Sequence, residues 1–126
     1  MDESGIMVIE DFEITLPWPP SVNHYWRRCG NRYFVSQEGR NYRDTVIGRC
    51  RENKVRYPKE NKLKLSIDAF PPDRRRRDLD NVLKSLLDSL QHAKVYEDDY
   101  QIDQLSVIRN QEIIGLVLVK ISVINY

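Results

Sequence analysis

The sequence of 126 residues lacks long hydrophobic runs and contains only two cysteines. No apolar stretch approaches the roughly 20 residues that a membrane-spanning helix needs, so no membrane span is predicted. The first five residues show no basic region followed by an apolar stretch, and we therefore expect no secretory signal and a cytoplasmic location. Cys29 and Cys50 match no zinc-binding spacing, and in a protein that is not exported they should stay reduced.

The chain also lacks internal repeats and any linker rich in glycine or serine. Its length fits one domain, and we expect a single domain over residues 1–126, with residues 1–8 disordered. Hydrophobic residues make up 40% and charged residues 31%, which indicates a globular chain. The formal net charge of +1 does not by itself indicate nucleic-acid binding, but the charges are clustered rather than evenly mixed.

Hydrophobic residues that alternate with polar ones predict β-strands. We expect strands over residues 9–16, 62–70, 105–109 and 113–124. The last segment is nearly all apolar, so it is predicted to lie in the centre of a sheet or at a dimer interface. The pair Gly30-Asn31 is typical of a turn and predicts a separate short hairpin within residues 21–35.

Helical spacing predicts two helices between the strands. The first is expected to run from a cap at Ser36 to about Tyr57, before Pro58, and the second from Leu79 to about Gln91. The segment from residue 92 to 103 is polar and acidic and is expected to be a loop. The order β-β-α-β-α-β-β predicts an α+β domain, with one mixed sheet and two helices packed on it.

Three aspartates near the second expected helix form a candidate metal site. Asp78 suits the N-cap and Asp80 the first turn, where the helix dipole favours carboxylates. Lys84 follows Asp80 by four residues, so both project from one helical face. Asp99, after Asp98, could reach this point only if the loop before it were fairly extended. Converging carboxylates that hold Mg²⁺ are what hydrolysis of a phosphodiester needs.

A purely structural interpretation of these residues is also open. Asp78 would then be only a cap, and Asp80 with Lys84 only a surface ion pair. Asp98 and Asp99 would belong to a solvated loop. Spacing alone favours this plainer interpretation, so the metal site needs further support.

Four consecutive arginines adjoin the aspartates. They are Arg74, Arg75, Arg76 and Arg77. Guanidinium groups bind phosphate bidentately and stay charged, so this run suits a phosphate backbone. A simple charged loop or a localisation signal is the alternative. Because the run lies next to candidate metal ligands, we favour binding to DNA or RNA.

An earlier segment interleaves aromatic and basic side chains. Its members are Trp18, Tyr25, Trp26, Arg27, Arg28, Arg32, Tyr33 and Phe34. Such a set could stack on unpaired bases, or its aromatic rings could simply pack in the core and turns. Packing is the favoured interpretation for Trp18 and Phe34. His24 and His92 have no partner at ligand spacing and receive no role.

Three blocks of the sequence resemble the RusA family of Holliday-junction resolvases. They are Leu16-Pro-Trp-Pro-Pro-Ser-Val-Asn-His-Tyr-Trp-Arg27, Pro72-Asp-Arg-Arg-Arg-Arg-Asp-Leu-Asp-Asn-Val-Leu-Lys84 and Asp98-Asp99. The second block is highly specific, and the other two support it. The resemblance implies a RusA-like fold and a homodimer that binds four-way DNA junctions. It also implies paired nicking of two strands with Mg²⁺, for which Mn²⁺ can substitute, in recombination and repair.

The resemblance also implies roles for individual residues. Asp78, Asp80 and Asp99 match catalytic, metal-binding aspartates, and Lys84 matches a catalytic lysine. Arg77 matches a basic residue at the DNA, and we expect Arg74, Arg75, Arg76 and Arg27 to bind DNA with it. Asp98 and Asn81 are accessory candidates. Because the family is common in phages and prophages, such an origin is expected here.

Two other functions remain open from the sequence. The chain could be a non-catalytic nucleic-acid-binding module in which the acidic groups only balance the arginines. It could also be a metal-dependent nuclease for another branched or single-stranded DNA. Cleavage of defined DNA substrates with and without Mg²⁺ separates these alternatives.

Overall fold

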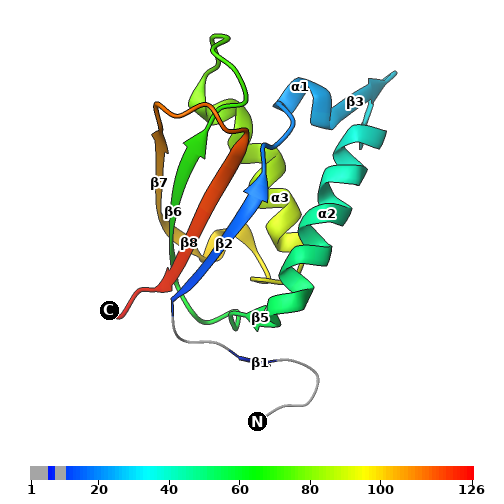
Figure 1. The fold of residues 1–126 in the computed structure, drawn as a ribbon. Coiled ribbons are helices and arrows are strands. Elements are labelled where there is room, and N and C mark those ends of the chain that lie inside the picture. The colour runs from blue at the N-terminus through cyan, green and yellow to red at the C-terminus, as the bar shows by residue number, and fades with distance from the viewer. Residues whose placement is uncertain (1–5, 8–10) are drawn as a thin grey trace.

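The structure is a computed structural model, which describes residues 6–7 and 11–126. Its main feature is a four-stranded sheet with the strand order β2-β8-β6-β7 (Figure 1). β2 (Phe12–Pro17) and β6 (Leu63–Phe70) pair antiparallel with β8 (Leu116–Val123), and β7 (Ile102–Arg109) pairs parallel with β6. The predicted mixed sheet and the α+β class are therefore confirmed, and β8 lies in the interior of the sheet.

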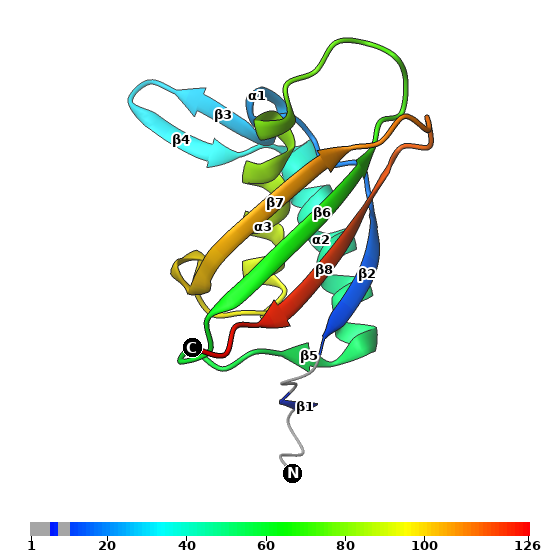
Figure 2. The same ribbon diagram turned by 90° about the vertical axis from the view of Figure 1, so that its left-hand side faces the viewer.

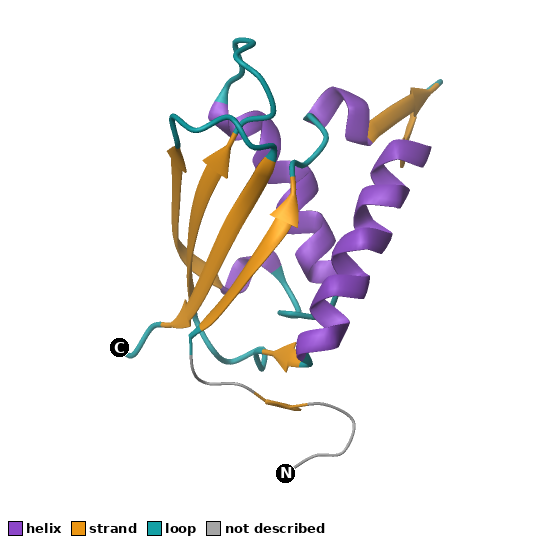
Figure 3. Cartoon of the chain, in the orientation of Figure 1, coloured by secondary structure: helices purple, strands orange, loops and turns teal. Residues whose placement is uncertain are grey.

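Two helices, α2 (Gln37–Asn53) and α3 (Leu83–His92), cover one face of this sheet (Figure 3). A 3-10 turn, η1 (Leu79–Val82), leads directly into α3. Ser36 caps α2 as predicted, because its hydroxyl accepts a hydrogen bond from the Gly39 N–H. The two helices and the sheet thus form two layers around one core.

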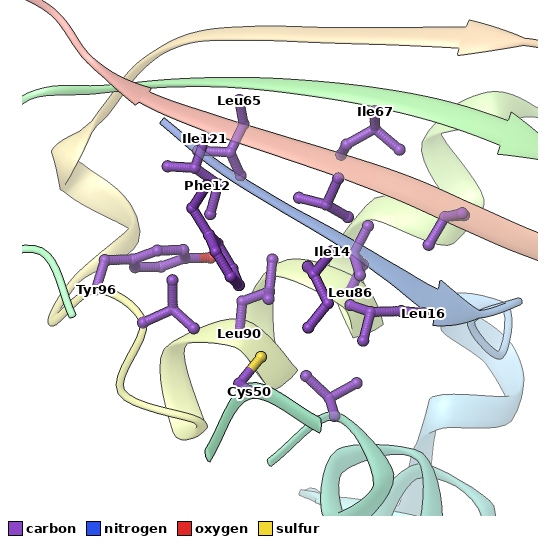
Figure 4. Close-up of a cluster of buried hydrophobic side chains, with 14 of the residues drawn as sticks. Phe12, Ile14, Leu16, Cys50, Leu65, Ile67, Leu86, Leu90, Tyr96 and Ile121 are labelled. Carbon is purple, nitrogen blue, oxygen red and sulfur yellow. The ribbon is translucent and has the colours of Figure 1, made fainter. Parts of the chain in front are cut away.

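The core fills the space between the sheet and the helices (Figure 4). Along β6 every second side chain is buried, and these side chains are Leu63, Leu65, Ile67 and Ala69. Leu86 and Leu90 of α3 are fully buried against them. The alternation in the sequence therefore identified the inner face of this strand correctly.

A small β-hairpin lies apart from the main sheet. It follows a one-turn helix, α1 (Val22–Tyr25), and consists of β3 (Trp26–Cys29) and β4 (Arg32–Val35). Gly30 takes a φ of 63° at the turn, a conformation that glycine adopts without strain. The hairpin predicted at Gly30-Asn31 is confirmed, whereas α1 was not predicted.

Several predicted boundaries were wrong. α2 ends at Asn53 rather than Tyr57, because Lys54 takes a left-handed conformation and β5 (Val55–Arg56) pairs with β1 (Ile6–Met7). The predicted single sheet is thus accompanied by two two-stranded ladders, β1-β5 and β3-β4.

At the C-terminal end, the predicted loop of residues 92–103 contains a 3-10 turn, η2 (Asp99–Gln101), and the start of β7. β7 begins early because Ile102 already pairs with Leu63 of β6. β8 starts three residues later than predicted, after Gly115, which has a φ of 91°.

The expected disorder of residues 1–8 falls, apart from Ile6–Met7, outside the described residues. Those two residues form β1 and pair parallel with β5. Among the residues that the structure describes, no helix is both long and apolar enough to cross a membrane.

Candidate active site

Asp78 and Asp80 lie together at the start of the η1–α3 segment, and both are exposed. Asp78 occupies the N-cap position of η1, but its side chain makes no capping hydrogen bond. Asp80 falls in the first turn, as predicted. Asp78 thus stands at the predicted cap position, while its carboxylate makes no hydrogen bond to the helix start.

Asp99 lies at the other end of α3. Its backbone N–H donates a hydrogen bond to Gln91 Oε1 at 3.2 Å, and Gln91 is in the last turn of the helix. The pKa of Asp99 is raised, mainly because the surrounding groups shield its carboxylate from water. Tyr96 opposes this rise, the negative charges of Asp88 and Asp98 add to it, and the positive charge of Lys84 opposes it.

The structure does not bring the three predicted metal ligands together within one chain. In the described part of the chain, no three His, Cys, Asp or Glu side chains are grouped closely enough to hold a metal ion. The arrangement consists of two half-sites, Asp78 with Asp80 and Asp99 with its neighbours.

Lys84 lies on α3 between these half-sites, and its side chain is exposed. The ion pairs formed by the described residues do not include one between Lys84 and Asp80, so the plain surface-pair interpretation is not supported. Its charge acts instead on Asp99. The exposed ammonium group is therefore accessible to a phosphate.

Asp98 has a structural role beside Asp99. Its carboxylate accepts a hydrogen bond from the Tyr100 N–H at 3.0 Å, and the Gln101 side chain accepts one from the Asp98 N–H at 3.1 Å. This reciprocal capping box fixes η2 and therefore the backbone that carries Asp99. We assign Asp98 to positioning Asp99.

Two of the four arginines, Arg75 and Arg77, pair with Asp73, and Arg77 is the less exposed of the two. Asp73 pairs with Arg77 at 2.7 Å and with Arg75 at 3.2 Å, and these partners, Arg77 first, hold the pKa of Asp73 well below its usual range. The Arg77 guanidinium also lies 5.8 Å from the centre of the Trp18 ring, and Arg109 donates a hydrogen bond to the Arg77 carbonyl. Arg77 is thus preorganised, while Arg75 is 81% exposed.

Arg74 and Arg76 are also exposed, and neither forms an ion pair or hydrogen bond among the described residues. A groove runs beside the arginine loop, between it and the start of α2. Its lining includes Pro17–Ser21, His24, Arg75–Asp78 and Asn81. The groove places Asp78 and Asn81 next to the arginines, as a phosphate-binding surface beside a half-site requires.

Asp88 on α3, a carboxylate not predicted from the sequence, contacts α2. Arg43 Nη2 contacts Asp88 Oδ2 at 2.8 Å, and the Tyr25 hydroxyl donates to the same oxygen. His92 Nε2 lies 3.8 Å from the other carboxylate oxygen. The helical spacing of Asp80, Lys84 and Asp88 was a signal that could have identified this residue.

The aromatic and basic segment divides into two parts. Tyr25 is fully buried and Trp18 packs against the core, as was favoured for Trp18. The packing expected for Phe34 is wrong, because Phe34 lies on β4 and is 46% exposed. Arg27 lies opposite it on β3 and is also exposed.

Comparisons with known proteins agree with this arrangement. Residues 17–122 match the family described as endodeoxyribonuclease RusA. The crossover junction endodeoxyribonuclease of Enterobacteria phage HK97 is 45% identical over 107 residues, which cover 85% of this chain and 89% of that protein. The crossover junction endodeoxyribonuclease of Escherichia coli strain K12 is 41% identical over 98 residues, or 78% of this chain and 82% of that protein. The crossover junction endodeoxyribonuclease of Enterobacteria phage 82 is 40% identical over 98 residues, or 78% of this chain and 82% of that protein. The chain therefore belongs to the RusA family.

Proposed function

We propose that the protein is a Mg²⁺-dependent endodeoxyribonuclease that resolves Holliday junctions by paired strand nicking, in DNA recombination and repair. The observation that carries this proposal is the pair of exposed carboxylates, Asp78 and Asp80, directly beside the arginine loop and its groove. The names of the relatives support the same reaction and substrate. The phage relatives support a phage or prophage origin, and an enzyme acting on such DNA works in the cytoplasm.

Asp78 and Asp80 would hold the ion. Their oxygen donors suit Mg²⁺, or Mn²⁺ in its place, because Mg²⁺ is usually bound by one or two carboxylates and keeps several waters. When bound, such an ion makes a water more acidic and stabilises negative charge on the phosphate. Arg77, held by Asp73, would orient the phosphate, and Arg74, Arg75 and Arg76 would bind the flanking backbone. Lys84 would contact the phosphate that is cut.

Asp99 would complete the site of a second copy. β7 is an edge strand of the sheet, and along it Leu105 and Ile108 are 43% and 57% exposed. An exposed apolar edge strand is a template for pairing with another chain. If two β7 strands pair antiparallel, the start of β7 in one copy lies beside its end in the other. Asp99 precedes that start, and Arg109 at that end contacts Arg77.

This homodimer also suits the substrate. A twofold axis would give two equivalent sites, and a four-way junction offers two equivalent strands. The absence of a complete metal-binding group among the described residues supports a site that two copies share. Dimerisation would thereby restrict hydrolysis to DNA that engages both copies.

The test is incubation of purified protein with a synthetic four-way junction, the matching duplex and a single strand, with and without Mg²⁺. We expect paired nicks in the junction with Mg²⁺ and none without it. Salt-sensitive binding without any cleavage would instead indicate a non-catalytic binding module. Equal or better cleavage of the single strand, or of another branched DNA, would indicate a nuclease with a different substrate.

A further inference from the structure

The β3–β4 hairpin is a basic arm that projects from the two-layer body (Figure 2). The sequence has no acidic residue from Ile14 to Gln37. Three arginines of the hairpin, Arg27, Arg28 and Arg32, are exposed. None of the residues proposed for metal binding or catalysis lies on this arm. Its positive charge is nevertheless complementary to the negative charge of DNA.

The base of the hairpin is held firmly against α2. The Ser36 N–H donates to the Tyr25 carbonyl at 2.8 Å, and Arg40 Nη1 donates to the Val35 carbonyl at 2.9 Å. Gly39 packs so closely that an added Cβ would lie 2.7 Å from Val35 Cγ1 and 2.8 Å from the Tyr25 carbonyl oxygen. The arm therefore has a fixed origin and a fixed direction, although its end is exposed.

The exposed end carries an aromatic ring with a guanidinium group near one side of it. Tyr33 is 67% exposed, and the Arg28 guanidinium lies 5.8 Å from the centre of its ring. Arg28 is held there because its Nε donates to the Gly30 carbonyl at 2.9 Å. An exposed aromatic ring beside a guanidinium is the combination on which unpaired bases stack.

The arm is also connected to the candidate active site. Tyr25, at its base, is hydrogen-bonded to Asp88, whose charge acts on Asp99. His24, next to Tyr25, lines the groove that continues to Arg75–Asp78. The groove thus reaches the base of the hairpin.

We propose that this hairpin recognises the branch point of the DNA, with Tyr33 stacking on a base that is exposed there and Arg27 and Arg32 binding neighbouring phosphates. A continuous duplex presents no free base face, so this contact favours branched over linear DNA. The inference rests on the proposed function in taking branched DNA as the substrate. It assigns to the hairpin the selection of DNA structure and leaves hydrolysis to the aspartates.

The first experiment compares binding without divalent metal to a four-way junction, to a duplex with one unpaired base and to the intact duplex. The variants are Tyr33→Ala, Tyr33→Trp and, as a control at an exposed residue away from the hairpin, Asp11→Asn. We expect Tyr33→Ala to weaken binding to the first two DNAs by about 5- to 150-fold, the loss associated with one stacked base. Binding to the intact duplex should change by less than about 2-fold, and Tyr33→Trp should bind like the unmodified protein.

Equal loss on all three DNAs, or no loss on any, would overturn the inference. A protein that fails to cut junctions with Mg²⁺ would instead overturn the proposed function. In that case the affinity of the Tyr33 variants for the duplex with one unpaired base still tests the role of Tyr33, because this binding is measured without cleavage.

A second experiment uses the exposed Cys29 in the hairpin as a labelling site. Burial raises the pKa of the other thiol, Cys50, to about 11, so a thiol-reactive dye labels Cys29 selectively. We expect the dye signal to change when the junction is added and to stay nearly constant with the intact duplex. A signal that instead depends on protein concentration without DNA would mean that the hairpin contacts a second copy, and would overturn the inference.

Discussion

Arg43 on α2 and Asp88 on α3 form an ion pair, with Nη2 and Oδ2 2.8 Å apart. Their side chains are 20% and 28% exposed. This pair is therefore better shielded from water than the Arg75–Asp73 pair, whose side chains are 81% and 42% exposed. It joins the two helices, and the Tyr25 hydroxyl of α1 donates a hydrogen bond to the same carboxylate. The base of the hairpin and both helices thus meet at Asp88, whose negative charge contributes to the raised pKa of Asp99.

Replacing Arg43 should therefore destabilise the fold. Arg43→Gln leaves Asp88 partly buried without its cation, and we expect the free energy of unfolding to fall by about 1–3 kcal/mol. Denaturant unfolding of Arg43→Gln, Asp88→Asn and the double variant measures this effect. The double variant should lose less than the sum of the two single changes, and simple additivity would contradict a direct pair.

Asp80→Asn should abolish cleavage while DNA binding persists. The substitution removes a proposed metal ligand, and we expect the rate of junction cleavage to fall by roughly 100-fold or more, given the several kcal/mol that a metal ion supplies. Affinity for the junction should stay the same or rise, because one negative charge near the phosphates is lost. Asp11→Asn is the matched control, since Asp11 is exposed next to the start of β2, away from the arginine loop at its other end. Full activity of Asp80→Asn would refute the assignment.

Asp99→Asn should increase stability at neutral pH. The pKa of Asp99 is raised in the folded protein, so the folded state binds this proton more tightly than the unfolded state does. The ionised carboxylate therefore costs stability above its folded pKa, and that cost disappears as the pH falls below the unfolded pKa of about 3.9.

We expect the variant to have a higher free energy of unfolding than the unmodified protein at pH 7, by a small amount because solvent screens part of the effect. The difference should shrink towards zero near pH 4. Urea unfolding at both pH values, in the presence of a chelator, measures it. A variant that is less stable than the unmodified protein at pH 7 would contradict the prediction.

Mixing two inactive variants tests whether Asp99 acts in a second copy. In a mixed dimer of Asp80→Asn and Asp99→Asn, one of the two shared sites retains both aspartates. We therefore expect cleavage to reappear on mixing, as nicks in one strand, although each variant alone is inactive. If Asp99 serves its own chain, no activity returns.

Ile108→Lys supplies the control for the dimer in this experiment. It places a charge on the exposed edge of β7, which should prevent pairing of two edges. Light scattering should show monomers for this variant. Adding Ile108→Lys to both members of the mixture should abolish the recovered activity, and persistent recovery would point to another interface.

Local patterns predicted most of the framework but not how distant segments meet. The alternation in β6 and the Ser36 cap were visible in the sequence because each depends on neighbouring residues. The half-site at Asp99 was harder to place. The loop before it was long enough to reach the start of α3, but Val95 and Tyr96 are fully buried and draw this loop into the core. The Tyr57 N–H also donates to the Val95 carbonyl at 2.8 Å, a contact between residues far apart in the sequence.

The role of Asp88 depended on the same kind of long-range information. Arg43 and Tyr25 are separated from it by 45 and 63 residues, so no spacing rule connects them. Phe34 illustrates the opposite error, since an aromatic side chain is usually buried, yet this one lies on the projecting hairpin.

The length of β7 has a consequence for how this sequence can change. The strand has eight residues, and at about 3.3 Å per residue it separates the Asp99 turn from the Arg109–Arg77 contact by roughly 26 Å. Inserting or deleting one residue would rotate the remainder of the strand by half a turn and expose Val107 in place of its neighbours. A change of two residues would keep every side chain on its face and alter only the spacing. We therefore expect functional length variants of β7 to differ by even numbers of residues.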